Sequence, residues 1–270
     1  MTEPMLIVKN LCMDILKDGK PLPILKDVSF EIRSGETWGI AGESGAGKSM
    51  TMYCLTALLP RHTVRTSGEI LYREQDGRYT NLADIPWRER QRYCSKKTCL
   101  ILQDSINALN PFERVGDQWA ETVRFHHPNL GKDAVLKHIL EQMEAFGITG
   151  GAEVARKYPH QLSGGMRQRI AIAMALESEA KLLIADEPTT SLDTINQRRA
   201  VEFIDNLRRE RGLSMLYITH NLGIIQAVCE NVIIMKDGGI VEQGRTQDVF
   251  SHPKHEYSQR LLDETRRIQR

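Results

Sequence analysis

The sequence of 270 residues lacks any long hydrophobic run: no stretch approaches the ~20 apolar residues that a helix needs to span a bilayer. The N-terminal stretch MTEPMLIVKN has an acidic residue and only a short apolar run, which is not the pattern of a secretory signal. We therefore expect a soluble, cytoplasmic chain. Any membrane association is expected to come through a partner.

The sequence also lacks an excess of one charge sign and closely spaced pairs of cysteines. With 36 basic and 35 acidic residues, the formal net charge is +1, so no global attraction to nucleic acid or anionic lipid is expected. The 5 cysteines form no C-x-x-C pair and are odd in number, which argues against a disulfide framework or a zinc site. They are predicted to be reduced and partly buried. The length permits one large domain or two small ones.

The strongest motif that is present is GESGAGKS, which runs through Gly42, Glu43, Ser44, Gly45, Ala46, Gly47, Lys48 and Ser49. It fits G-x-x-x-x-G-K-[ST], the phosphate-binding loop, whose amides cradle phosphates while the lysine reaches the terminal ones and the hydroxyl goes to Mg²⁺. The preceding ETWGIAG predicts a short buried strand. The following KSMTMYCLTALL predicts a helix, whose N-terminus favours anions.

Two adjacent acids, Asp186 and Glu187, close an apolar run in LLIADE. Such a run fits a buried parallel strand, and ligands of parallel sheets bind outside the carboxyl ends of the strands. Asp186 would then hold Mg²⁺ with Ser49, while Glu187 polarises the water that attacks the γ-phosphate. A phosphate loop by itself leaves kinases, GTPases and motor ATPases open, and an acidic strand end alone is a weak signal.

A third motif lies between these two, in HQLSGGMRQR, where Ser163, Gly164 and Gly165 open a predicted helix. A helix N-terminus with a serine hydroxyl and bare backbone amides is a second anion site. Two sites for the same phosphate are redundant within one subunit. They make sense if the second site closes over ATP held by another subunit, so that the active site is complete only in a dimer.

Short apolar runs elsewhere predict strands. They are MLIVKNL, VSFEIRS, SGEILY, the turn-rich DGRYTNL, TCLILQDS, KLLIADEP and SMLYITH. VIIMKDGGIVEQG predicts a hairpin around Asp237 and Gly238. The tail LLDETRRIQR predicts a charged helix that could be a solvated end.

A mainly helical insert is predicted over about residues 107–178. Leu136, Leu140 and Met143 sit at helical spacing before Gly147. Helical character resumes between residues 166 and 176. The insert therefore separates two blocks that are rich in predicted strands.

Together the motifs resemble the ATP-binding cassette (ABC) family over most of the chain. In that family GESGAGKS is Walker A, LSGGM the signature and LLIADE Walker B; Gln103 matches the Q-loop glutamine, SLD (191–193) the D-loop and His220 the switch histidine. The resemblance implies an α/β fold: a P-loop NTPase ABC-type nucleotide-binding domain with a RecA-like core, an antiparallel β-subdomain and a helical subdomain. It places the ATPase domain at 1–250 and a short family tail at 251–270.

The resemblance also implies an ATPase that uses ATP and Mg²⁺. Its expected catalytic residues are Glu187, His220, which contacts the γ-phosphate, and Gln103, which senses Mg²⁺ and the attacking water. The metal is expected at Ser49, Gln103 and Asp186. Nucleotide contacts are expected from Gly42 through Ser49, and from Met50, Ser163, Gly164, Gly165 and Asp193.

Within the family, QDSINALNP after the Q-loop, Met166 where most cassettes have glutamine, and HPKHEYSQRLL in the tail resemble the peptide/nickel importer ATPases. This implies a second ABC ATPase subunit, in a homodimer or heterodimer, beneath two membrane permeases fed by an extracytoplasmic substrate-binding protein, with no nucleic acid as partner. The expected location is the cytoplasmic face of the cell membrane, held through the permeases. The shortness of the tail favours nickel or a metal chelate over a di- or oligopeptide.

A permease helix docks, in related importers, in a groove between the Q-loop and the helical insert. The resemblance therefore implies that NALNPFERVGDQW lines such a groove here. Phe112 and Trp119 are the aromatic candidates for contact, although either could belong to the core.

Two other functional classes remain as alternatives to a transport ATPase. A soluble cassette of the translation type usually carries two cassettes, and one of the repair type carries a long coiled coil before its signature. This sequence has one phosphate loop, and the stretch from Ser49 to Ser163 is too short, and too broken by Gly and Pro, for such a coil. A regulatory cassette without turnover commonly loses the glutamate or the histidine, and Glu187 and His220 are both present.

An aromatic residue that the family usually has is absent. Cassettes usually place one roughly 25 to 30 positions before the phosphate-loop lysine, where stacking on adenine is worth ~1–3 kcal/mol. The corresponding stretch Asn10–Ser29 contains no Phe, Tyr, Trp or His. We predict that an aliphatic residue such as Ile15 or Leu16 covers the base, if any residue does, with modest affinity and weak discrimination between ATP and GTP.

Overall fold

The structure is a computed structural model that describes residues 3–103, 108–189 and 194–268. Its strands are β1 (Pro4–Lys17), β2 (Lys20–Arg33), β3 (Thr37–Ala41), β4 (Thr63–Arg73), β5 (Tyr79–Asn81), β6 (Thr98–Ile101), β7 (Leu182–Asp186), β8 (Ser214–Ile218), β9 (Asn231–Lys236) and β10 (Gly239–Arg245). Its helices are α1 (Lys48–Thr56), α2 (Trp87–Cys94), α3 (Val115–His126), α4 (Lys132–Ala145), α5 (Gly151–Ala155), α6 (Gly164–Ala175), α7 (Thr194–Glu210), α8 (Leu222–Val228), α9 (Thr246–Ser251) and α10 (Glu256–Ile268), with 3₁₀ turns at Leu82–Asp84 and Pro159–Gln161.

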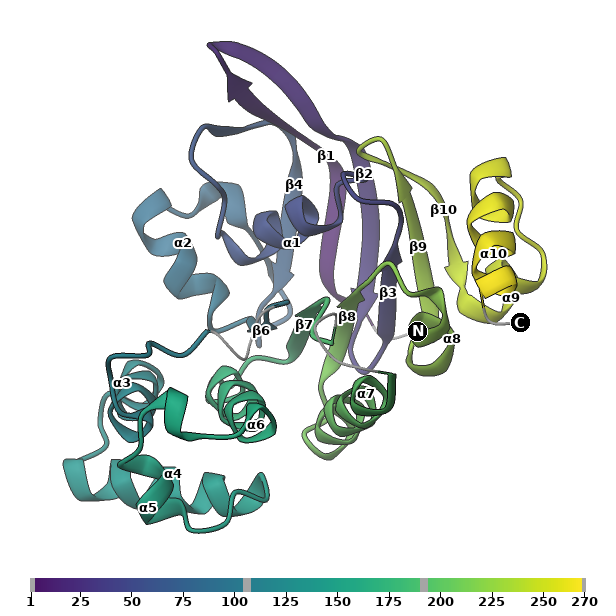
Figure 1. Cartoon of the computed structure of the whole chain (residues 1–270). Helices are drawn as coiled ribbons and strands as arrows, with labels where there is room; N and C mark the ends of the chain where they lie inside the picture. Colours follow the sequence, from purple (N-terminus) through teal and green to yellow (C-terminus); the bar gives the residue numbers. More distant parts are fainter. Residues whose placement is uncertain (1–2, 104–107, 190–193, 269–270) are drawn as a thin grey trace.

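Two sheets organise these elements (Figure 1). Within the described ranges, a 6-stranded sheet has the order β10-β9-β3-β8-β7-β6 and a 4-stranded antiparallel sheet the order β2-β1-β4-β5. The larger sheet is parallel from β9 to β6, and β10 joins it as an antiparallel edge strand. The predicted α/β class is confirmed.

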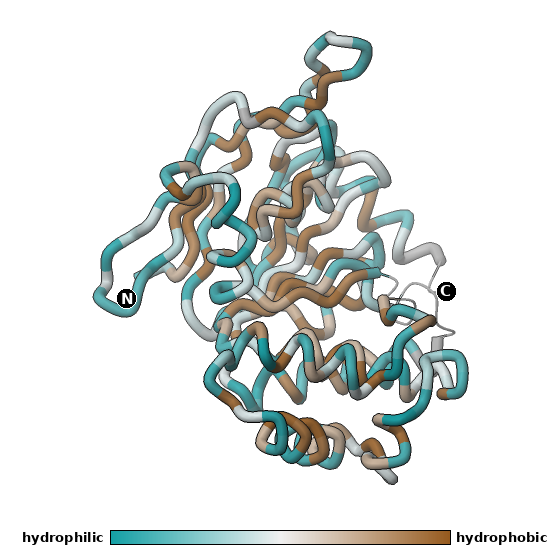
Figure 2. Tube along the Cα trace, turned by 90° about the vertical axis from the view of Figure 1, so that its left-hand side faces the viewer, coloured by the Kyte–Doolittle hydropathy of each residue, from teal (hydrophilic) through white to brown (hydrophobic). Residues whose placement is uncertain are grey.

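The larger sheet is the centre of the core because both of its faces are covered. Strands β3, β7 and β8 are buried along their whole length. Successive side chains of a strand point to opposite faces: Leu183 of β7 packs in the cluster that includes α3, α4 and α6, and Leu182 packs in the cluster that includes α1 and the antiparallel sheet. Figure 2 shows the hydrophobic residues concentrated along these central strands.

Helices α3 to α6 gather at one side of the molecule (Figure 1). The predicted helix before Gly147 is α4, but its predicted apolar stripe is wrong at Leu136, which is 53% exposed. The buried residues of α4 are Val135, Ile139 and Met143, spaced four apart, so Met143 of the predicted stripe is confirmed. The stripe is displaced because helical spacing is satisfied by both sets, and only the packing against α3, α5 and α6 selects between them.

Other local predictions are confirmed with small changes. The strand before the phosphate loop is β3, and the predicted hairpin is β9–β10, whose turn residues Asp237 and Gly238 both have positive φ, as a type I′ turn requires. The helix after the loop stops at Thr56, because Ala57 adopts a left-handed conformation with φ 56°.

All of the cysteines are free thiols, and four of them are buried: Cys54, Cys94, Cys99 and Cys229. In the part of the chain that the structure describes, no helix has the length and apolar character needed to cross a bilayer.

The tail helix is α10, and it is more than a solvated end. It lies beside β10 at the edge of the larger sheet (Figure 1) and contacts α8. Tyr257 and Leu262 of α10 are buried in the core, together with Val249 and Phe250 of α9. The charged side chains of α10 are typical of a solvated helix, whereas its apolar side is packed in the core.

Candidate nucleotide-binding site

A cavity of about 670 Å³ lies where β3, β7 and β8 end. It is lined by Ile24, Ser44, Gly45, Gly47, Lys48, Ser49, Met50, Gln103, Glu187 and His220. These three strands are neighbours and parallel, so their carboxyl ends meet at the same edge of the sheet. Most of the predicted phosphate-loop residues therefore lie beside the predicted catalytic residues, although they are far apart in the sequence.

The loop after β3 is held close to β9. Gly42 has φ +151°, and a Cβ at this position would lie 2.3 Å from the carbonyl oxygen of Met235, so only glycine fits. Inside the loop, Lys48 Nζ donates hydrogen bonds to the carbonyl oxygens of Gly42 (2.8 Å) and Glu43 (2.9 Å). Burial lowers the pKa of Lys48, although the nearby carboxylates Glu187 and Asp186 act in the opposite direction. The lysine is thus enclosed by the loop that is predicted to hold phosphates.

Asp186 lies at the end of β7 beside Ser49. Burial raises the pKa of Asp186, and a hydrogen bond from the Ser49 side chain opposes that rise. Among the described residues, none hydrogen-bonds to the buried oxygen Oδ1 of Asp186. Mg²⁺ prefers carboxylate and hydroxyl oxygens. The unpartnered carboxylate oxygen next to a serine hydroxyl therefore fits a magnesium ion, and the exposed Gln103 lines the same cavity.

Glu187 and His220 are in contact across the ends of β7 and β8. His220 Nδ1 lies 3.0 Å from Glu187 Oε1. The backbone of Glu187 has φ 43°, a conformation that costs a residue with a side chain roughly 1–2 kcal/mol. Its N–H donates to the carbonyl oxygen of Ile218 (2.8 Å), which holds the turn. The turn brings the Glu187 side chain to the cavity wall, where a general base is expected.

The residues of the SGG motif are not part of this cavity. Ser163 is the N-cap of α6, and its Oγ accepts a hydrogen bond from the backbone N–H of Met166 (3.3 Å). A Cβ at Gly164 or Gly165 would meet nothing within 4 Å, and neither residue has a left-handed φ. Nothing in the described part of the chain therefore requires glycine there. The predicted contact Asp193 lies outside the described residues.

The structure places a different aliphatic residue of the predicted stretch 10–29 at the cavity. Ile24 of β2 lines the cavity next to Gly45 and Gly47, whereas Ile15 and Leu16 do not line it. Those two residues lie near the far end of the long β1–β2 hairpin, where Ile15 pairs with Leu22 and Leu16 with Pro21. The aliphatic character of the stretch was visible in the sequence, but the register that brings Ile24 to the loop was not.

A fold with this loop, this acidic strand end and this arrangement of sheets defines the class of ATP-binding cassette ATPases. The sequence profile of the ABC transporter family matches residues 25–190, and the chain belongs to this family. The predicted family and ATPase activity are thereby confirmed.

Curated relatives match nearly the whole chain. A dipeptide transport ATP-binding protein of Bacillus subtilis, DppD, is 38% identical over 267 residues, which are 98% of this chain and 78% of the relative. An oligopeptide transport ATP-binding protein of the same organism, OppD, is 38% identical over 259 residues, 96% of this chain and 71% of the relative.

Solved structures agree with the fold. The cbiO1 protein of Clostridium perfringens, described as part of the ABC transporter complex cbiONQ, matches with a TM-score of 0.74 and 26% identity, covering 98% of this chain and 97% of its own. A dimeric bacterial ABC transporter cassette matches with a TM-score of 0.73 and 26% identity, covering 90% and 99%.

Lys48 and Glu187 are predicted to have separable effects. Lys48→Ala should weaken nucleotide binding because the terminal phosphates lose their cation. Glu187→Gln should keep ATP bound and slow turnover ~10²- to 10⁴-fold, the usual contribution of a general base. ATP affinity and ATPase rate of both variants, measured in the assembled transporter, check this. An unchanged rate in Glu187→Gln would exclude Glu187 as the base.

A tyrosine at position 24 should tighten nucleotide binding. Ile24 lines the cavity beside the phosphate loop, and stacking of a base on an aromatic ring is worth ~1–3 kcal/mol. Wild-type affinities for ATP and GTP should be similar, since no aromatic residue in 10–29 reads the base. The measurement is the dissociation constant of both nucleotides for Ile24→Tyr, with Ile15→Tyr as the matched control that should change nothing. A strong preference of the wild type for ATP would mean that another group recognises adenine.

Proposed function

We propose that the chain is the ATP-hydrolysing subunit of an importer that takes up a di- or oligopeptide through partner permeases. The cavity that brings Lys48, Ser49 and Glu187 together is the observation that supports ATP hydrolysis. The peptide cargo is supported by the names of the relatives, which are dipeptide and oligopeptide transport proteins. Nickel or a metal chelate is the second candidate, because the motifs resemble the peptide/nickel importer ATPases as a group.

In this proposal the polar residues of the cavity divide phosphate binding, catalysis and metal binding among them. The loop amides and Lys48 bind the phosphates, and Glu187 accepts the proton of the attacking water. His220, whose Nδ1 lies 3.0 Å from Glu187 Oε1 in this structure, rotates to contact the γ-phosphate when ATP is bound. Gln103 orients the attacking water and the metal. Mg²⁺, held by Ser49 and Asp186, would neutralise the charge that develops on the phosphates.

A second ATPase subunit completes the site. A Cβ at Gly164 or Gly165 would meet no described atom within 4 Å, so another molecule can approach the backbone there. The backbone amides at the N-terminus of α6 can bind an anion. Because these residues do not line the cavity of their own chain, we propose that they close over the nucleotide of a partner subunit. The partner can be a second copy or a related chain.

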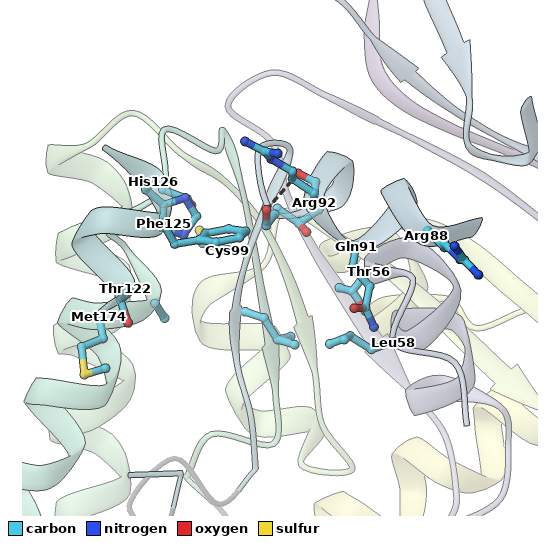
Figure 3. Close-up of a pocket in the computed structure, with 15 residues that line it drawn as sticks. Thr56, Leu58, Arg88, Gln91, Arg92, Cys99, Thr122, Phe125, His126 and Met174 are labelled. Carbon is cyan, nitrogen blue, oxygen red and sulfur yellow. Dashed lines mark hydrogen bonds between the residues drawn. The ribbon is translucent and has the colours of Figure 1, made fainter. Parts of the chain in front are cut away.

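Permeases are the further partners in this proposal, and a second cavity is the candidate docking surface for one of their helices. This cavity of about 570 Å³ lies between α2, α3 and the end of α6, as Figure 3 shows. Leu58 and Phe125 provide exposed apolar surface, 41% and 54% exposed, and Arg88 and Arg92 of α2 add positive charge. We propose that a permease helix docks here, which would hold the chain at the cytoplasmic face of the membrane.

The segment predicted to line the docking groove is residues 107–119, and its described part, 108–119, does not line this cavity. Trp119 is fully buried and donates a hydrogen bond from Nε1 to Glu177 Oε1 (2.6 Å), so it is a core residue. Phe112 is 87% exposed but lies outside the cavity. The wall of the cavity proposed for docking comes instead from the later half of α3, at Thr122, Phe125 and His126, so this proposal places the docking surface elsewhere than the sequence did.

Gly164→Asp should separate ATP binding from turnover. The carboxylate would face the γ-phosphate of the partner's ATP, and like charges repel in a partly desolvated site. The isolated chain should bind ATP as before because its own phosphate loop is intact, whereas the assembled transporter should lose most of its ATPase rate. Equal loss of ATP binding by the isolated chain would show that the motif is only structural.

The transport function is tested by uptake in the organism that encodes the chain. Deletion of the gene should abolish uptake of a radiolabelled dipeptide or oligopeptide and leave nickel uptake unchanged. Complementation with Phe125→Asp should fail, since a charge disrupts the apolar docking surface, although the purified variant still binds ATP; Phe112→Asp is the control that should complement. Loss of nickel uptake alone would favour the second cargo, and no change in any uptake would favour a non-transport cassette.

A further inference from the structure

The C-terminal helix reaches the phosphate loop. Tyr257 in α10 is 3% exposed, and its hydroxyl oxygen accepts a hydrogen bond from the backbone N–H of Glu43 (3.1 Å). Glu43 is the second residue of the loop, more than two hundred positions earlier in the sequence. The motif HPKHEYSQRLL therefore has a contact with the nucleotide site that the proposed function does not use.

The contact acts on a peptide group that is held from both sides. The carbonyl oxygen of Gly42 and the N–H of Glu43 belong to the same peptide unit, and in a trans peptide they point in opposite directions. Lys48 Nζ donates to that carbonyl (2.8 Å), and Tyr257 accepts from that N–H (3.1 Å). Between them, the two side chains determine how this peptide plane is turned.

The tail motif positions the tyrosine. The carboxylate of Glu242 in β10 accepts hydrogen bonds from the backbone N–H groups of Lys254 (2.9 Å) and His255 (3.1 Å). His255 Nδ1 in turn accepts from the N–H of Tyr257 (3.1 Å), which satisfies a free amide at the start of α10. These bonds fix where α10 begins, and so the point from which the ring of Tyr257 reaches the loop.

Two cations flank the ring. Lys236 Nζ lies 5.1 Å from its centroid and the Arg260 guanidinium 5.8 Å, both within the range of cation–π attraction. Arg260 also lies 3.8 Å from the Glu43 carboxylate, an exposed pair of little energetic weight. The ring is thus held on several sides, and its hydroxyl has a defined position at the loop.

We propose that Tyr257 is a positioning residue for the phosphate loop. When Lys48 leaves the carbonyl of Gly42 to bind phosphate, the hydroxyl of Tyr257 keeps the Gly42–Glu43 peptide in its orientation. The amides that follow in the loop then remain directed at the nucleotide. The inference rests on the proposed role of residues 42–49 in phosphate binding.

The test is Tyr257→Phe in the purified full chain, which removes one oxygen and keeps the packing of the ring. A net hydrogen bond of the usual strength corresponds to a rise of about threefold to tenfold in the dissociation constant for ATP. Hydrogen exchange at the Glu43 amide, followed by NMR, should become faster. The matched control is Tyr72→Phe: Tyr72 is also buried and donates from its hydroxyl to the carbonyl of Leu55 (2.5 Å), so this variant should lower thermal stability without changing ATP affinity.

Lys48→Ala serves as the positive control for the loop itself. If it leaves ATP affinity unchanged, the proposed phosphate loop is wrong. If it weakens ATP binding while Tyr257→Phe changes neither ATP affinity nor Glu43 exchange, only the positioning role is overturned. An equal loss of affinity in Tyr257→Phe and Tyr72→Phe overturns it as well. Glu242→Gln, which keeps the tyrosine but disturbs the start of α10, should weaken ATP binding in the same direction.

Discussion

The parallel pairing of β3, β8 and β7 is the constraint on which the nucleotide site depends. Their hydrogen-bonded register places Ile40 beside Ile218, and Asp186 beside Ile218 on the other side of β8. The phosphate loop, the two acids and His220 therefore leave the sheet at the same edge. Since all three strands are buried on both faces, the register cannot slip without exposing or misplacing core side chains.

The two faces of the larger sheet are covered by different parts of the chain, and these parts place different residues relative to the cavity. The antiparallel sheet and α1 cover one face, and they bring Ile24 to the cavity. The helices α3 to α6 contribute to the other core cluster, and they carry the SGG motif away from the cavity of their own chain. This separation is the physical reason that a partner subunit is proposed: within one chain, the SGG motif and the cavity that holds the phosphate loop lie apart.

The loop itself has little freedom. Gly42 lies close to the carbonyl oxygen of Met235 in β9, the strand that pairs with β3. Lys48 Nζ donates hydrogen bonds to the loop carbonyls of Gly42 and Glu43. Tyr257 adds a contact from the last helix. A loop whose backbone is held before its ligand arrives loses less conformational entropy on binding, which favours affinity. The C-terminal tail is, in this view, part of the nucleotide site as well as a structural end.

Much of the local structure and the set of candidate residues followed from the sequence, because glycines, a lysine and acids at fixed spacing carry their own conformational and chemical requirements. GESGAGKS predicted the loop between strand and helix, and LLIADE predicted a buried strand with acids at its end. Four matters were decided only by tertiary structure: the burial of Val135 rather than Leu136, the place of Ile24 in the cavity, the burial of Trp119, and the reach of Tyr257 to Glu43. Each of these depends on contacts between segments distant in sequence, and spacing within one segment contains no information about which neighbour will cover it.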